Sequence, residues 1–297
     1  MNQATLIQEI NYLLFLAVLS VTLCSCATYM VFFLTQKNQI RKWARFLLIG
    51  SWVLQSGYIA TRYMTIGNTP ITTYHEAVFF FAWATTSAYL SFRWRYTVKN
   101  FGTFVSLLIF GLLLGSSLAS REIIPLEPAL QSLWLPVHAG ISLIAYGFLG
   151  LAFCGGVMYL LQERELKSRK LGYFFSRLPS LDALDQLNSH CLAIGFVFLT
   201  LGMVTGMFWS KQAWGTYWRW NPKEVCSLII WFLYLVQIHQ RFTVGWRGRR
   251  AALMIVGSFA VVLITLWSGA DYFVRFWRDV VRGSPRGPGP RSEGDGG

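Results

Sequence analysis

Trp214-Gly-Thr-Tyr-Trp-Arg-Trp-Asn-Pro-Lys-Glu224 places three Trp and one Tyr within seven residues. A loop gains little from so much aromatic area unless the rings have a surface to pack against. The end of the stretch has the pattern of a helix start. Asn221 can cap a helix, Pro222 suits the first helical position, and Glu224 suits the acidic position of a capping box. We therefore predict an aromatic loop joined to the start of a helix.

This aromatic cluster has two interpretations. Trp and Tyr collect at membrane interfaces without binding any ligand, and a loop between two spans would show them there. A binding function is favoured here because the rings alternate with the cations Lys211, Arg219 and Lys223. An aromatic surface surrounded by cations suits a flat, apolar ligand with two negative charges. Haem, with a porphyrin face and two propionates, fits that description.

The composition indicates a membrane protein: of the 297 residues, 54% are hydrophobic and 13% are charged. Eight apolar stretches have about the 20 residues that a helix needs to cross a bilayer. The N-terminus lacks the basic region and the cleavage site of a signal peptide, so the first stretch is expected to remain as a span. We predict an all-α integral membrane protein with spans at about 10–35, 44–64, 74–92, 101–119, 137–161, 187–209, 223–241 and 251–273.

These spans form one expected membrane domain, residues 1–273, with no separate soluble domain. Residues 274–297 are rich in Gly, Pro and Arg and predict a disordered basic tail. The five Cys form no Cys-x-x-Cys pair, and we expect them to be small core residues.

The distribution of charge predicts the orientation. The linkers after the first, third, fifth and seventh spans carry 16 Lys and Arg, whereas those after the second, fourth and sixth carry 5. The positive-inside rule then places both termini and the aromatic stretch on the outer side. The tail, with five Arg, runs against this rule. The net charge of +13 is attributed to loops that meet the lipid bilayer, and no nucleic-acid partner is expected.

Three of the four histidines are candidate haem ligands, because ionisable groups in or near spans are costly to bury. His75 and His138 begin the third and fifth spans, at the expected depth of the aromatic stretch. Two neutral imidazoles on opposite faces of a porphyrin would complete a six-coordinate iron. A hydrogen-bonded structural histidine is the alternative for each of them.

His239 lies 15 residues after Glu224 on the same expected helix, which places it about 22 Å deeper. It cannot share a metal with the outer pair, so it would bind a second haem near the inner side. The second ligand of that haem would be His190 or a residue of another chain. We favour another chain and interpret His190 as structural.

These residues also carry a resemblance to a family. The aromatic stretch resembles the tryptophan-rich WWD signature of cytochrome c assembly proteins, most closely the CcsA/ResC type of the system II haem lyase. Leu130-Gln-Ser-Leu-Trp-Leu-Pro-Val-His138 is similar to the segment before that family's outer haem-ligating histidine. Further similar segments bring the coverage to roughly residues 67–273: Ile194-Gly-Phe196, Leu199-Thr-Leu-Gly202, Ile238-His-Gln-Arg241 and Gly245-Trp-Arg-Gly-Arg-Arg250.

The resemblance implies that the chain presents haem b, bound non-covalently, to the Cys-x-x-Cys-His site of an apocytochrome c. His138 would be an outer ligand, and His239 would ligate a transmembrane haem together with a CcsB/ResB-type partner subunit. The membrane would be a bacterial plasma membrane or a thylakoid membrane. The expected haem-binding residues beyond the histidines lie at 209–224: Trp209, Trp214, Tyr217, Trp218, Arg219, Trp220, Asn221, Lys223 and Glu224.

Three departures from the family pattern matter. Asn221 replaces the aspartate of the signature; it caps a helix equally well but lacks the negative charge. The stretch Gly269-Ala-Asp-Tyr-Phe-Val-Arg-Phe-Trp277 lacks the second outer histidine that the family carries after its last span. The short segment before the third span reads Thr73-Tyr-His-Glu76. We hypothesise that His75 supplies the missing outer ligand.

The expected mechanism is positioning, and no residue of the chain is predicted to act as a nucleophile. The aromatic loop would hold the haem, while Arg219, Lys211 or Lys223 would bind its propionates. The rate would rise because the cysteine thiols are held close to the vinyl carbons. Two other functions stay open: a haem transporter or chaperone without lyase activity, and a membrane regulator of haem metabolism.

Overall fold

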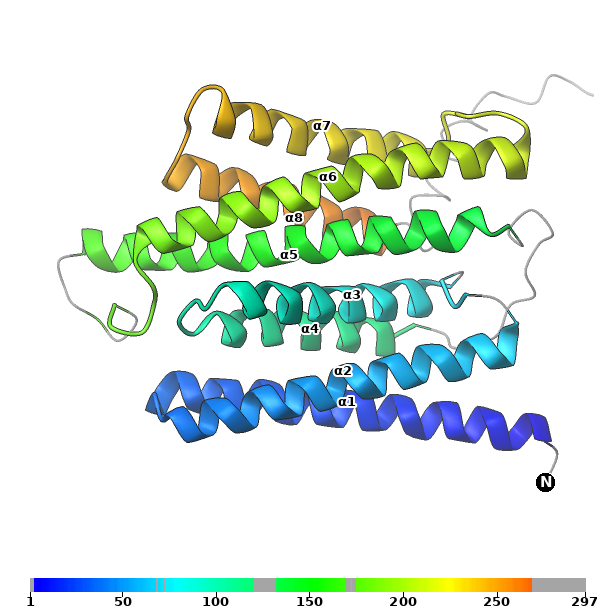
Figure 1. The fold of residues 1–297 in the computed structure, drawn as a ribbon, viewed down its shortest axis with the longest axis horizontal. Helices are drawn as coiled ribbons and strands as arrows, with labels where there is room; N and C mark the ends of the chain where they lie inside the picture. Colours follow the sequence, from blue (N-terminus) through cyan, green and yellow to red (C-terminus); the bar gives the residue numbers. More distant parts are fainter. Residues whose placement is uncertain are drawn as a thin grey trace, which may run out of the picture.

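The computed structural model describes residues 3–67, 69–71, 73–119, 132–168, 172 and 175–268. Throughout this part of the chain every regular element is an α-helix, as the sequence predicts (Figure 1). The helices are α1 (Gln3–Thr35), α2 (Asn38–Ile66), α3 (Tyr74–Arg95), α4 (Phe101–Ser117), α5 (Trp134–Lys167), α6 (Leu181–Trp214), α7 (Pro222–Phe242) and α8 (Arg249–Ser268). The expected tail at 274–297 lies outside the described residues.

The helices run side by side and alternate in direction, so that consecutive connections lie at opposite ends of the bundle (Figure 1). α5 is the central helix, because it packs against α3, α4, α6 and α8. Its contact with α6 is the most extensive in the molecule. The starts of α3, α5 and α7 all lie at the end of the bundle where α1 begins. This shared end brings together the segments that the sequence marks as functional.

Five helices are long and apolar enough to cross a membrane by length and composition: α1, α5, α6, α7 and α8. α4 is apolar but shorter, at 17 residues. α2 and α3 are long, but they carry polar residues that the fold buries, among them Gln55 and Arg62 on α2 and Glu76 on α3. The eight predicted spans are therefore present as helices, and five of them meet the criteria for a membrane span.

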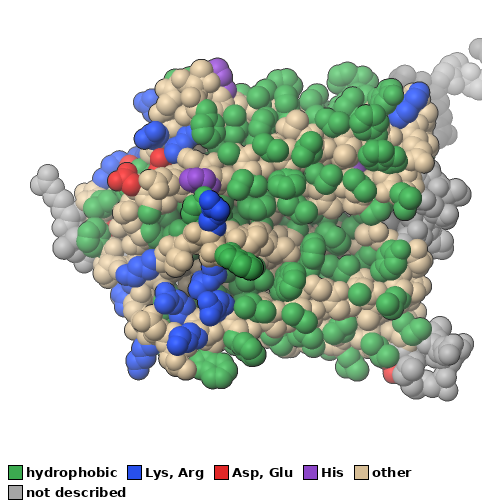
Figure 2. Space-filling model, in the orientation of Figure 1, with side chains coloured by type: hydrophobic (Ala, Val, Ile, Leu, Met, Phe, Trp, Pro, Cys, Tyr) green, Lys and Arg blue, Asp and Glu red, His purple; other side chains and the backbone are tan. Residues whose placement is uncertain are grey.

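Most cationic side chains on this face gather at one end of the bundle, on the left in Figure 2, and apolar side chains predominate over the middle of the face. The connections at that end are α1 to α2, α3 to α4, α5 to α6 and α7 to α8. These connections and the adjoining helix ends contain the described basic residues at 37–45, 93–99, 164–167, 177 and 241–250. The uneven distribution of Lys and Arg between alternate linkers in the sequence therefore becomes an uneven distribution of charge between the two ends of the bundle.

Candidate functional site

The aromatic loop begins where α6 ends. Gly215 ends the helix with a φ of +78°, a left-handed conformation that costs glycine little, and its N–H donates to the carbonyl of Lys211. The Lys211 ammonium donates back to the carbonyl of Gly215 at 2.8 Å. The hydroxyl of Ser210 donates to the carbonyl of Thr216. These bonds fix the chain as it leaves α6.

The loop ends at the predicted helix start of α7. Asn221 is the N-cap, its side-chain oxygen accepts from the N–H of Glu224 at 2.9 Å, and Pro222 follows as expected. The Glu224 carboxylate accepts from the Asn221 amide and from the backbone N–H of Arg219. Between them Trp220 has a φ of +57°, which is rare for a bulky residue. The bonds on either side of Trp220 hold it in that conformation.

Two cations, one at the end of α6 and one in the loop, lie over rings of the aromatic loop. The guanidinium of Arg219 lies 4.2 Å from the ring centroid of Trp214, and the ammonium of Lys211 lies 5.4 Å from that of Tyr217. Trp218 meets Trp220 edge-on at 5.8 Å. Trp220 is 68% exposed, so it presents the most open indole face of the loop. The rings of the loop therefore do not form one open aromatic surface: Trp214 and Tyr217 are covered by cations, whereas Trp220 is exposed.

His138 lies in the second turn of α5, against α6. Its ring is parallel to that of Trp209, with centroids 6.2 Å apart. Its Nδ1 lies 2.8 Å from the carbonyl oxygen of Gly202, which can only accept, so Nδ1 carries the proton. Nε2 then holds a lone pair, and it has no hydrogen bond to any residue that the structure describes. This is the tautomer that a metal ligand requires.

The sequence analysis did not identify Gly206, which shapes this site. A Cβ at Gly206 would lie 2.8 Å from Cε1 and 2.9 Å from Nδ1 of His138, closer than real contacts allow. Gly202 makes a similarly close approach to Ser142. The spacing of these two glycines, four residues apart on one helix, is the signal for close helix packing that could have revealed them.

Two further contacts join the start of α5 to the end of α6. The rings of Trp134 and Phe208 stack at 5.6 Å, and Phe208 also meets Tyr217 edge-on at 6.4 Å. The Ser132 hydroxyl donates to the side-chain oxygen of Gln212 at 2.7 Å. These contacts hold the start of α5, with His138, against the end of α6 that leads into the aromatic loop.

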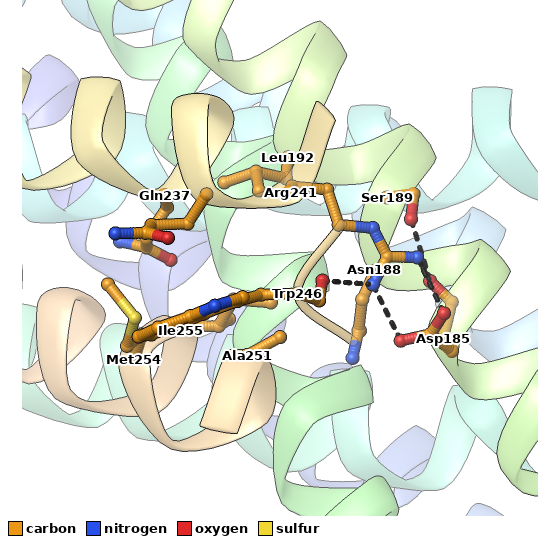
Figure 3. A pocket seen from close by; sticks show the side chains of 11 residues that line it. Asp185, Asn188, Ser189, Leu192, Gln237, Arg241, Trp246, Ala251, Met254 and Ile255 are labelled. Atoms are coloured by element: carbon orange, nitrogen blue, oxygen red, sulfur yellow. Dashed lines mark hydrogen bonds and ion pairs between the residues drawn. The ribbon is translucent and has the colours of Figure 1, made fainter. Parts of the chain in front are cut away.

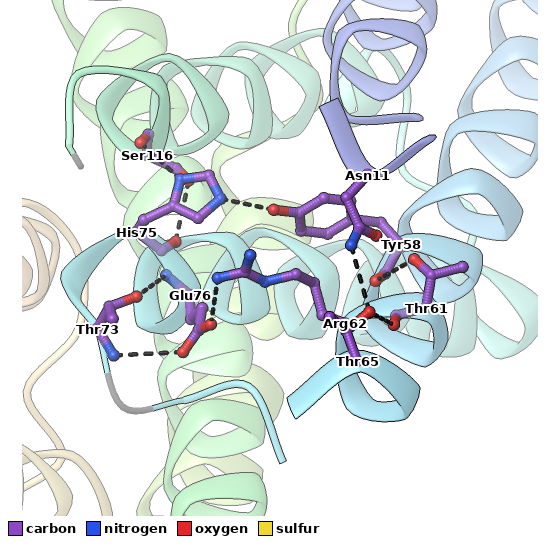
Figure 4. Close-up of polar contacts among 9 residues, drawn as sticks. All are labelled: Asn11, Tyr58, Thr61, Arg62, Thr65, Thr73, His75, Glu76 and Ser116. Atoms are coloured by element: carbon purple, nitrogen blue, oxygen red, sulfur yellow. Dashed lines mark hydrogen bonds and ion pairs between the residues drawn. The ribbon is translucent and has the colours of Figure 1, made fainter. Parts of the chain in front are cut away.

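His75, the other expected outer ligand, begins α3 at the same end of the bundle, but its surroundings differ (Figure 4). It is fully buried. Nδ1 lies 2.9 Å from the carbonyl of Ser116, and Nε2 lies 2.9 Å from the Tyr58 hydroxyl. In this structure neither ring nitrogen is open to a metal. His75 instead joins α2 to α4, and it lies within a cluster of aromatic rings with Phe15 and Phe79.

Next to His75 lies a buried ion pair that the sequence analysis also missed. The Arg62 guanidinium on α2 donates to Glu76 on α3 at 2.7 Å, with side chains 5% and 1% exposed. Glu76 forms a capping box with Thr73 at the start of α3. Figure 4 shows the pair beside Asn11. Together these contacts fix the start of α3 against α2.

His239 lies near the opposite end of α7 and is exposed. Close to it Arg241 holds Asp185 of α6 through two nitrogens at 2.7 and 2.6 Å. Figure 3 shows this pair beside Trp246 in a small pocket between α6, α7 and α8. His190 instead lies 5.1 Å from the ring of Tyr96, the residue after α3, and its Nδ1 bonds to the carbonyl of Gln186 in its own helix.

Lys223, the last expected cation of the site, is exposed in the first turn of α7. It makes no ring contact or ion pair with a described residue, and it lines a cavity between α3, α5, α7 and α8. The structure therefore brings together His138, Trp209, the loop rings, Arg219 and Lys211, and places His75, His239 and Lys223 elsewhere.

Fold and site together define an integral membrane protein. At one end of its helical bundle it carries an aromatic loop and an imidazole, that of His138, whose Nε2 has no hydrogen bond to a described residue. Residues 71–281 match the family model described as cytochrome C assembly protein. This chain belongs to the cytochrome c assembly protein family.

Several relatives named cytochrome c biogenesis protein CcsA are similar to the chain. The protein of Parasynechococcus marenigrum is 30% identical over 237 residues, covering 71% of this chain and 78% of the relative. That of a Synechococcus strain is 28% identical over 273 residues, covering 73% and 79%. The Chlamydomonas reinhardtii protein is 30% identical over 211 residues, and the match covers 69% of this chain but only 59% of that relative.

Among solved structures, the fold is similar to that of the cytochrome c heme lyase CcmF, with a TM-score of 0.66. The two sequences are 17% identical, and the match covers 95% of this chain and 51% of CcmF. The chain thus spans about half of that protein, and the likeness concerns the fold alone.

Proposed function

We propose that this chain is the haem-handling subunit of a cytochrome c haem lyase, which presents haem to apocytochrome c for thioether attachment. The observation that supports this most strongly is His138, whose ring is fixed by Gly202 and Trp209 while Nε2 stays without a partner among the described residues. The exposed Trp220 offers an aromatic face at the same end of the bundle. Because the chain belongs to the cytochrome c assembly protein family, haem is the ligand that we assign to His138 and Trp220.

In this proposal haem b is cargo, held without a covalent bond until it is transferred. Haem supplies the vinyl groups and the apocytochrome supplies the thiols, so the chain needs no nucleophile of its own. His138 orients the haem through its iron, and Trp220 packs against the porphyrin. Arg219 and Lys211 can leave their ring faces, at 4.2 and 5.4 Å, to bind propionates by charge-assisted hydrogen bonds.

His75 is not needed as a ligand in this proposal. Binding iron would break its hydrogen bond to Tyr58 or to Ser116 in a fully buried site, at a cost of about 1–3 kcal/mol for each group left unpaired. The second axial position of the outer haem then stays open to another imidazole, such as that of the Cys-x-x-Cys-His motif.

We further propose that His239 ligates a second haem, with a CcsB/ResB-type subunit as the partner. His239 is exposed on α7, where an approaching helix of another chain can reach it. His190 contacts Tyr96 instead, which makes a pairing within the chain less favourable. The two haem sites would lie near opposite ends of the bundle.

The orientation follows from the cationic end of Figure 2, which the positive-inside rule places in the cytoplasm or stroma. The start of α1, the aromatic loop and the end of α8 then lie on the outer side, where apocytochromes receive haem. The membrane is a bacterial plasma membrane, with a thylakoid membrane as the alternative.

The direct test is co-expression of the chain with a CcsB/ResB-type partner and a reporter apocytochrome c, followed by detection of covalently bound haem. The proposal predicts attachment by the unchanged chain and its loss with His138→Ala. His190→Ala, an exposed histidine bonded to its own helix, is the matched control and should retain attachment. Bound haem in the chain without attachment to the reporter would indicate a transporter or chaperone, and absence of both would indicate a regulator.

A further inference from the structure

The basic end of the bundle has two parts that differ in their acidic residues. In the part formed by α5 to α8, the carboxylates of Glu163 and Asp185 pair with described cations. The helices α1 to α4 contain only two carboxylates, Glu9 and Glu76, and both lie near helix starts at the other end of the bundle. On the face shown in Figure 2, the cationic side chains at the lower left accordingly have no acidic side chain among them.

Six cations of the second part form what we call the basic patch: Lys37, Arg41, Lys42, Arg45, Arg93 and Arg95. None of them forms an ion pair with a residue that the structure describes. Arg45 of α2 and Arg93 of α3 both interact electrostatically with the Tyr29 side chain, so cations of two helices lie near the same point. Because like charges repel one another, a bound anion would stabilise this arrangement.

The exposed side of α2 continues from the basic patch into an apolar surface. Phe46, Ile49 and Val53 follow Lys42 and Arg45 at intervals that keep all five on one side of the helix. The three apolar side chains, which we call the apolar stripe, are 68%, 40% and 56% exposed. A ligand that contacts the patch and the stripe together needs a negative charge and an adjoining apolar chain.

Two exposed indoles indicate the depth of the basic patch in the membrane. Trp43 of α2 is 58% exposed and Trp94 of α3 is 94% exposed, and each is adjacent in sequence to cations of the patch. Tryptophan collects at the level of the lipid head groups. A cluster of cations directly beside membrane spans is also typical of sites for anionic head groups. The phosphates of membrane lipids therefore lie at the height of the basic patch.

We propose that the basic patch binds an anionic phospholipid, with its phosphate at Lys42, Arg45 and Arg93 and its acyl chains along the apolar stripe of α2. A free phosphate offers the same charge but has nothing that would cover the apolar stripe. The inference goes beyond the proposed function, because it uses none of the haem-binding residues. α2 also lies outside residues 71–281, which match the family model, so the family does not predict this site. The proposal would stand if the chain bound no haem.

The experiment measures lipid binding to the detergent-purified full chain by native mass spectrometry. The probes are dioleoyl phosphatidylglycerol and dioleoyl phosphatidylcholine, which share their acyl chains, with inorganic phosphate as a competitor. The test variant is Lys42→Gln/Arg45→Gln, in which both altered side chains are exposed, so that the fold should be retained. The matched control is Lys167→Gln/Arg249→Gln at the same end of the bundle, which removes two exposed cations that pair with Glu163.

We expect the unchanged protein to bind phosphatidylglycerol more tightly than phosphatidylcholine. Each cation near an anionic lipid contributes about a fivefold gain in affinity. The Lys42→Gln/Arg45→Gln protein should therefore bind phosphatidylglycerol about twentyfold more weakly, and phosphatidylcholine as the unchanged protein does. The control variant should keep its affinity for phosphatidylglycerol, because the cations that it loses are already paired with a carboxylate.

Four results would overturn the proposal. The first is equal affinity of the unchanged protein for the two lipids. The second is an affinity for phosphatidylglycerol that survives Lys42→Gln/Arg45→Gln. The third is an equal loss of affinity in the control variant, which would show that net charge and not the basic patch attracts the lipid. The fourth is displacement of the lipid by inorganic phosphate at the same concentration, which would show that the acyl chains do not contribute.

Discussion

His75 and His138 lie at the same end of the bundle, each near the start of its helix, yet they differ in burial and in their hydrogen-bond partners. His75 is fully buried, and both ring nitrogens have partners 2.9 Å away. His138 is partly exposed, and among the described residues only its Nδ1 has a hydrogen-bond partner. His75 joins α2 to α4 through hydrogen bonds, whereas His138 is fixed by one hydrogen bond at Nδ1 and keeps a lone pair on Nε2. Depth in the bundle therefore does not distinguish the two histidines, whereas the number of ring nitrogens that have a hydrogen-bond partner does.

The two neighbourhoods also differ in how they are built. Around His75 the polar groups pair with one another, as Arg62 does with Glu76. Around His138 the backbone of Gly206 lies so close to the imidazole ring that a Cβ at this position would collide with it. We expect the first region to govern stability and the second to govern ligand binding, and the following variants test that division.

The largest effect is expected from Arg62→Met, which leaves the Glu76 carboxylate buried without its cation. Removing one partner of a buried ion pair costs about 3–5 kcal/mol. The free energy of unfolding in detergent should fall by this amount. Lys167→Met, in an exposed pair with Glu163 at 2.7 Å, is the matched control and should cost less than about 1 kcal/mol. Equal losses for the two variants would refute a special role for the buried pair.

Gly206→Ala should displace the His138 ring with little change elsewhere. Overpacking of a close contact costs about 1–3 kcal/mol, so the haem affinity should fall about tenfold. The haem retained per protein after purification measures this. Gly140→Ala, on the same helix as His138 but with no atom within 4 Å of the added Cβ, should retain haem. Full retention by the Gly206 variant would mean that His138 is not the ligand.

Trp220→Ala should remove the exposed face of the loop. The stacking geometry of an aromatic pair contributes about 0.5–1.5 kcal/mol, so haem affinity should fall roughly threefold to tenfold. Trp94→Ala removes an indole that is 94% exposed at the other end of the bundle, and it should not change affinity. Haem titration followed by absorption compares the two. An equal loss of haem affinity in both variants would show that the Trp220 ring does not bind haem specifically.

The smallest effect is expected from Asn221→Ala, which removes the N-cap of α7. Loss of such a cap costs about 1 kcal/mol. Asn221→Asp keeps an oxygen that can accept from the N–H of Glu224, and it should be close to neutral for thermal stability despite the nearby Glu224 carboxylate. A larger loss for the Asp variant than for the Ala variant would show that charge, and not capping, selects Asn here.

Much of this architecture follows from the sequence. Apolar stretches of about 20 residues predict helices well because length and hydropathy act locally. The helix start at Asn221 and Pro222 is confirmed for the same reason, since a cap involves residues three apart. The capping box is not completed, because the Glu224 carboxylate accepts from the N–H of Arg219 and the side-chain amide of Asn221 instead of the backbone N–H of Asn221. The family resemblance is confirmed by the match over residues 71–281.

The parts that the sequence did not reveal depend on contacts between distant segments. The bond from His75 to Ser116 spans 41 residues, and that from His138 to Gly202 spans 64. No local pattern states which nitrogen such a bond occupies. The covering of Trp214 by Arg219 likewise depends on the conformation of the loop. Helix starts could be predicted, but the surroundings of each histidine required the fold.

In the proposed function, His138 and not His75 is the outer haem ligand. The most direct measurement is the absorption spectrum of the detergent-purified protein, reduced and oxidised, for the unchanged chain, His138→Ala and His75→Ala. We predict that His138→Ala loses the outer haem bands and that His75→Ala keeps them at the same wavelengths, with a lower yield of folded protein. Loss of those bands in His75→Ala together with their retention in His138→Ala would show that His75, and not His138, is the ligand.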